Sequence, residues 1–168
     1  MAEADQTAAE AVSKPAPSIS IKAQYLRDLS FENVAVQQAG GRLDDKPEIQ
    51  VGVNLDAKKR GEDTYEVILK VTATAKGEDV MMFLIEMEYA GVFEIKNVPE
   101  NQLHPVLMIE CPRIIFPFAR RIVSDLTRDG GYPPLMLDMV DFAGIYRAEL
   151  EKRRAAAELE NEPAAGNA

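Results

Sequence analysis

The chain has 168 residues, of which 46% are hydrophobic and 28% are charged, as in a soluble globular domain with a sizeable core. Its 19 Lys and Arg residues face 28 Asp and Glu residues, which gives a formal net charge of −9 at pH 7. An acidic surface repels phosphate backbones and anionic membranes, so we expect no nucleic-acid partner and favour basic or apolar partners.

The sequence carries no signal for an oxidising compartment or a membrane. Cys111 is the single cysteine, so no internal disulfide can form. Residues 1–17 contain acidic side chains and no apolar run, unlike a secretory signal peptide. No stretch approaches the roughly 20 apolar residues that span a bilayer. We therefore expect a cytoplasmic protein without direct membrane insertion.

Composition divides the chain into a central domain and two ends. Residues 1–18 are rich in Ala, Glu, Ser and Pro, which predicts a flexible N-terminal tail. Residues 159–168 are small and polar, which predicts a flexible C-terminal tail. Residues 19–158 then form a single domain.

Alternating apolar and polar residues predict four strands in the first half of this domain. The strands are expected from about Ile19 to Phe31 and over residues 49–55, 65–75 and 80–95.

Turn signals between the later strands are short enough for hairpins, which predicts an antiparallel sheet. The first connection, residues 33–47, is long for a hairpin and is compatible with a crossover. The fourth strand is apolar on both faces near its start. It is either a central strand covered on both sides or a surface for a partner, for which adaptable Met side chains are well suited.

Helices are predicted in the second half. Residues 100–110 suggest a short helical segment interrupted by Pro105, and residues 114–126 carry an apolar stripe over about half of a helix. Pro117 fits this helix only if the helix starts shortly before it. Because the stripe is wider than one sheet face can cover, either a second protomer covers part of it or the helix is buried more deeply within one chain.

An apolar, Pro-rich connection follows over residues 131–137, either as a packed link or as the wall of a peptide groove. The final helix should start after Asp141 as N-cap and run to about Glu158, with only its first two turns packed.

The sequence does not favour a metal site or a set of catalytic residues. His104 is the single histidine and Cys111 precedes a proline, so neither a metal site nor a Cys–His pair is favoured. Glu86 and Glu88 share one strand face, which solvated charges explain more simply than acid–base catalysis. We expect no enzyme, no cofactor and no metal.

Four segments together resemble one family, the bacterial export chaperone SecB. They read Y-L-R-D-L-S-F-E-N (25–33), E-Y-A-G-V-F-E-I (88–95), C-P-R-I-I-F-P-F-A-R (111–120) and L-T-R-D-G-G-Y-P-P-L-M-L (126–137). The resemblance covers about residues 19–147. It implies an α+β fold in which a four-stranded antiparallel sheet with a long first connection precedes helices packed on one face. It also implies a homotetramer, a dimer of dimers, whose centre holds the long helix. The interface residues expected from this are Ile115, Ala119, Ile122, Val123 and Leu126.

The same resemblance implies a function. Such chaperones hold unfolded precursor proteins in apolar grooves without ATP and deliver them to the SecA translocation ATPase. By resemblance, the SecA-docking residues are Asp28, Glu32, Leu84 and Glu86. The candidate residues of the peptide groove are Phe31, Phe93, Tyr132, Leu135 and Leu137. An oligomeric adaptor without holdase activity is the chief alternative, and an enzyme acting on a small ligand ranks third.

Overall fold

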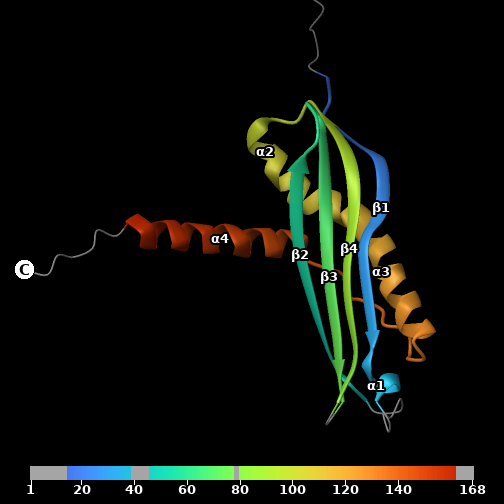
Figure 1. The fold of residues 1–168 in the computed structure, drawn as a ribbon. Helices are drawn as coiled ribbons and strands as arrows, with labels where there is room; N and C mark the ends of the chain where they lie inside the picture. Colours follow the sequence, from blue (N-terminus) through green and yellow to red (C-terminus); the bar gives the residue numbers. More distant parts are fainter. Residues whose placement is uncertain (1–14, 39–45, 78–79, 162–168) are drawn as a thin grey trace, which may run out of the picture.

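One antiparallel sheet carries the fold in the computed structural model, which describes residues 15–38, 46–77 and 80–161 (Figure 1). The alternating segments form the expected strands, in the spatial order β1-β4-β3-β2. Their bounds are β1 Ser18–Asn33, β2 Glu48–Lys59, β3 Thr64–Lys76 and β4 Met81–Lys96.

The long first connection is a crossover, which confirms the expectation drawn from its length. Strands β2, β3 and β4 follow one another as neighbours, whereas β1 pairs with β4 at the opposite edge of the sheet from β2. The short helix α1, Val34–Gln37, begins this connection. Strand β1 contains two register shifts, and β2 pairs with β3 without any. The sheet therefore has an irregular edge at β1 and a regular edge at β2.

The two faces of the sheet differ in what covers them. Odd-numbered residues of β3 and β4, from Val67 to Ala75 and from Phe83 to Ile95, point toward the helices and form the core. Helix α3, Cys111–Asp129, packs on this face against β3 and β4. The other face, which we call the open face, has no helix on it within the described parts of the chain (Figure 1).

The helical half begins earlier than the stripe suggests. Helix α2 (Glu100–Pro105), a π-helical turn η1 (Val106–Glu110) and α3 follow without a break. The Cys111 N–H donates to the Val106 carbonyl five residues back, as in a π turn. This wider turn precedes Pro112, which has no N–H to offer. Pro117 consequently lies in the interior of the helix, and not within a first turn as predicted.

Helix α4, Phe142–Asn161, leaves the body of the molecule as expected (Figure 1). Asp141 is its N-cap, because the Asp141 Oδ1 atom accepts the Gly144 N–H at 3.0 Å. Side chains 151–158 are all exposed. The helix ends three residues inside the segment expected to be a tail. The tail predictions otherwise fall largely on residues 1–14 and 162–168, outside the described residues. No described helix is both long and apolar enough to cross a membrane.

Candidate functional site

An apolar groove runs between strand β2 and the Pro-rich connection. Its cavity of ≈ 390 Å³ is open to solvent. The floor comes from the alternate residues Ile49, Val51 and Val53, which face the helix side at the edge of the sheet. The wall comes from residues 135–140, where Met136 and Met139 are 59% and 82% exposed. Such a surface offers apolar area and flexible thioether side chains to an incoming segment.

The start of the Pro-rich connection is fixed to the sheet by hydrogen bonds. The Asn33 side-chain amide donates to the Gly130 carbonyl at 2.8 Å, and the Tyr132 hydroxyl donates to Asn33 Oδ1 at 2.7 Å. A Cβ at Gly130 would lie 2.5 Å from the Phe31 ring, so only glycine permits this approach. The connection therefore leaves the end of α3 along a defined path before it reaches the groove.

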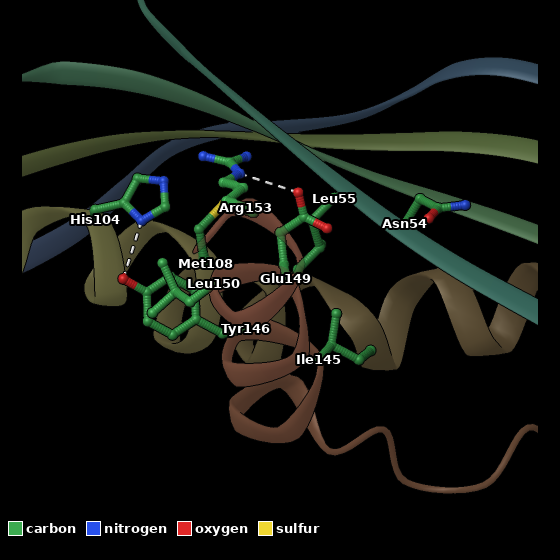
Figure 2. A pocket seen from close by; sticks show the side chains of 9 residues that line it. All are labelled: Asn54, Leu55, His104, Met108, Ile145, Tyr146, Glu149, Leu150 and Arg153. Carbon is green, nitrogen blue, oxygen red and sulfur yellow. Dashed lines mark hydrogen bonds and ion pairs between the residues drawn. The ribbon is translucent and has the colours of Figure 1, made fainter. Parts of the chain in front are cut away.

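A second hollow lies farther along β2, between this strand, the α2–η1 segment and helix α4 (Figure 2). Its volume is ≈ 240 Å³, and it combines apolar walls such as Leu55 and Met108 with polar groups. His104 Nδ1 and the Tyr146 hydroxyl lie 3.1 Å apart, and Arg153 Nε donates to Glu149 at 3.0 Å. Along the helix side of β2, the first hollow is therefore apolar, and the second contains both apolar and polar side chains.

The open face carries a patch of carboxylates at the β1 edge. Glu32 lies directly opposite Leu84 in the β1–β4 register, and Glu86 lies opposite Ser30. Asp28, Glu32 and Glu86 are exposed, and none forms an ion pair with another residue that the structure describes. We call these three residues together with Leu84 the acidic patch. Unpaired, solvated carboxylates on one face can meet a cationic partner.

Neighbouring carboxylates on the open face are already neutralised. Glu88 lies within 3.0 Å of Lys70 and 3.5 Å of Arg27, and Glu94 lies within 3.0 Å of Lys22. The Lys22 ammonium is the main cause that lowers the pKa of Glu94, and Lys96 contributes as well. Along β1 and β4, the carboxylates of this face that pair with no described residue are therefore those of the acidic patch.

Glu66 is the most deeply buried carboxylate on that face, with 1% of its surface exposed. It accepts hydrogen bonds from the Tyr25 hydroxyl and from the Arg60 guanidinium, which come from β1 and from the end of β2. These partners lower the pKa of Glu66, and the same bond to Glu66 raises the pKa of Tyr25. The cluster ties both edge strands to β3.

Apolar side chains remain exposed where α3 lies beside β1. Ile114 and Phe118 on α3 are 42% and 41% exposed, and Leu26 on β1 is 42% exposed. The Phe118 ring stacks on Tyr89, with ring centroids 6.4 Å apart. Together with Ile19 and Ile21, which lie farther along the same edge strand, these residues form a surface that we call the β1–α3 surface.

Comparison with known proteins decides the family. A family model described as "Preprotein translocase subunit SecB" matches residues 12–153. The chain belongs to the SecB family. It is 52% identical over 163 residues to the protein-export protein SecB of Ruegeria pomeroyi, covering 95% of this chain and 97% of that protein. It is 55% identical over 143 residues to the SecB of Dinoroseobacter shibae, covering 83% of each. Membership places the chain among the protein-export chaperones.

A solved SecB-like structure has the same fold. The SecB-like chaperone of Mycobacterium tuberculosis, in complex with a peptide from the HigA1 antitoxin, matches with a TM-score of 0.61 at 15% identity. The match covers 73% of this chain and 90% of that one. The α+β architecture expected from the sequence is thereby confirmed.

The residues predicted to line the groove of this SecB-family chain lie in two places, the groove and the core. Leu135 and Leu137 line the groove, although Leu137 is buried. Phe93 and Tyr132 are also buried and belong to the core, and Phe31 packs beside Phe83 away from the groove. The β2 floor and the two Met residues were not predicted. The signals were present as the alternation of 49–53 and the apolar residues that continue beyond Leu137.

The predicted interface residues of this SecB-family chain differ in how far they are exposed. Ile115, Ala119 and Val123 have no exposed surface and pack under the chain's own sheet, while Ile122 and Leu126 are partly buried. The exposed half of the stripe lies at Ile114 and Phe118 instead, displaced around the helix axis. The four predicted docking residues do come together, because β1 pairs with β4 and sets Glu32 opposite Leu84 and Ser30 opposite Glu86, with Asp28 on the same face two residues before Ser30. Their role in docking stays a prediction.

Proposed function

We propose that the SecB-family chain is an ATP-independent holdase that binds unfolded precursor proteins in the apolar groove. The observation that carries this proposal is the exposed apolar groove between β2 and residues 135–140. Its open, unbranched Met side chains adapt to many sequences, which suits a chaperone with varied clients. Extended segments fit a groove that follows a strand, whereas folded domains bury the apolar side chains that the groove would contact.

The holdase proposal predicts a kinetic effect on precursor folding. A segment held in the groove cannot enter the core of its own protein, so capture competes with folding. Stopped-flow fluorescence of a denatured export precursor, diluted with and without the chain, measures this competition. We expect refolding to slow in proportion to the chain added. An adaptor without holdase activity would leave the refolding rate and the aggregation of the precursor unchanged.

We infer further that the chain assembles as a dimer of dimers through the β1–α3 surface. Strand β1 is an edge strand, and an edge strand offers unpaired N–H and C=O groups to a second chain. The exposed apolar side chains beside it, among them Ile114 and Phe118, are typical of an interface core. Several grooves on one particle would bind several segments of one precursor, which raises affinity by avidity.

Phe118→Asp is expected to prevent this assembly. The substitution places a charge in the centre of the apolar surface, where burial without a partner costs several kcal/mol. We expect native mass spectrometry to show a shift from tetramer to smaller species. Val36→Asp is the matched control, because Val36 is a 56% exposed apolar residue outside this surface. If Phe118→Asp stays tetrameric, or Val36→Asp dissociates equally, the assignment of the interface is wrong.

Delivery to the SecA ATPase is the last part of the proposal. The acidic patch supplies carboxylates that pair with no described residue and can meet a Lys/Arg-rich element of that partner. It lies on the open face of the sheet, whereas the groove lies on the helix side of β2. Both partners can therefore contact one chain at the same time. Binding of precursors before export places this activity in the cytoplasm.

A further inference from the structure

Thr127 is a buried polar residue that connects helix α3 to the groove wall. It lies in the last turns of α3 and has no exposed surface. Its hydroxyl accepts the Leu135 N–H at 2.9 Å and donates to the carbonyl of Val123 or Ser124, each at 3.1 Å. The hydroxyl thus joins the helix to the wall of the groove. A buried polar group is retained at little cost only when it is paired in this way.

This contact anchors the backbone of the groove wall, and the Ser124 hydroxyl adds a side-chain contact by donating to Met136 Sδ at 3.3 Å. Pro133 and Pro134 have no N–H, and of the described backbone groups in residues 133–139, only the Leu135 N–H has a hydrogen-bond partner. On the N-terminal side, the Tyr132 N–H donates to the Thr127 carbonyl at 3.0 Å. The same threonine therefore fixes the wall at two points, once through its backbone and once through its side chain.

The side-chain bond determines where the exposed wall residues lie. Leu135 and Met136 follow the anchored N–H directly, and Met136 faces the groove together with Val51. Without the hydroxyl, the partly buried Leu135 N–H would lose its one hydrogen-bond partner among the described residues. An unsatisfied N–H is costly, so the wall would move until that group met solvent.

We propose that the Thr127 hydroxyl is a positioning group that holds the groove wall ready for an incoming apolar segment. The inference rests on the proposed function, because it concerns the same groove. A preformed wall spares the binding reaction the entropy of ordering residues 135–140. Loss of the bond should weaken binding chiefly through faster dissociation, since a mobile wall releases its segment more easily.

The decisive comparison is between Thr127→Val and Thr127→Ser. Valine keeps the shape and removes the hydroxyl, whereas serine keeps the hydroxyl and leaves a small cavity. We expect Thr127→Val to bind an apolar, fluorescently labelled precursor peptide about fivefold more weakly. Thr127→Ser should bind within about twofold of wild type. A purely structural role predicts the reverse order, because the serine variant loses a buried methyl group.

Hydrogen exchange provides a second readout, and its wild-type arm does not depend on a variant folding. In the wild-type chain, we expect the Leu135 amide to exchange about tenfold more slowly than the Met136 amide. In Thr127→Val this protection should disappear. Thr74→Val is a matched control, because Thr74 lies on the open face and forms no side-chain hydrogen bond to a described residue.

Two results would overturn the inference. One is a Leu135 amide that exchanges as fast as Met136 in the wild-type chain. The other is Thr127→Val binding the peptide as tightly as wild type while Thr127→Ser does not. A wild-type chain that binds no apolar peptide would instead contradict the proposed function, which separates the two failures.

Discussion

Replacing Val51 by aspartate is expected to reduce the affinity for an unfolded precursor by about 100-fold or more. Val51 is 47% exposed and lies at the centre of the groove floor between Ile49 and Val53. A bound apolar segment would cover the new carboxylate without offering it a partner. Removing a charge from water in this way costs several kcal/mol, which exceeds the contribution of any single contact in the groove. Fluorescence anisotropy of a labelled, denatured precursor measures the loss.

The neighbouring residue provides the control for Val51→Asp. Gln50 is exposed on the same strand, but it points to the open face of the sheet. Gln50→Asp therefore introduces the same charge one residue away. It also introduces the same residue type, which has a low propensity for strands. We expect this variant to bind the precursor as wild type does. Equal loss in both variants would mean that charge or strand stability, and not the groove, governs binding.

The second large effect is expected on the open face. Asp28→Ala combined with Glu86→Ala should weaken SecA binding about tenfold at low salt, while precursor binding stays unchanged. Both carboxylates are exposed and unpaired among the described residues, so their field acts on an approaching cationic partner. The loss should appear mainly in the association rate, as is usual for charges at the rim of an interface. Surface plasmon resonance at several ionic strengths gives both rates.

A matched pair of carboxylates lies at the other edge of the same face. Glu48→Ala combined with Asp56→Ala removes the same formal charge from β2, although Asp56 lies 3.7 Å from the Lys58 ammonium. If the acidic patch is the docking site, this variant should bind SecA almost as wild type does. Equal weakening in both variants would show that net charge alone attracts SecA. Loss of precursor binding in the Asp28/Glu86 variant would indicate misfolding or a shared site.

The sheet was predictable because its signals are local. Alternation at residues 49–55 and 65–75 reflects one covered and one open face, and the short turns between strands require antiparallel neighbours. The first connection was too long for a hairpin and compatible with a crossover, which the strand order shows. Sequence periodicity does not say which strand lies at an edge, however. That is why the residues Ile49, Val51 and Val53 were recognised as a strand but not as a groove floor.

For helix α3, the sequence predicts the apolar stripe but not which part of it is buried. A stripe over half of its circumference is visible in residues 114–126, but periodicity alone does not say which half faces the chain's own sheet. Packing places Ile115 and Val123 inside and leaves Ile114 and Phe118 at the surface. The aromatic groove candidates show the same limit. Phe93 and Tyr132 are suited to a binding groove as well as to a core, and only the three-dimensional arrangement shows that they are buried.

The refolding of a denatured export precursor tests the central claim most directly. The precursor is diluted from denaturant into buffer that contains a molar excess of the chain, and its tryptophan fluorescence is followed; the chain itself contains no Trp. The account predicts that folding slows severalfold or stops with the wild-type chain and with Gln50→Asp, and proceeds almost freely with Val51→Asp. Unchanged folding in the presence of the wild-type chain would contradict the holdase function.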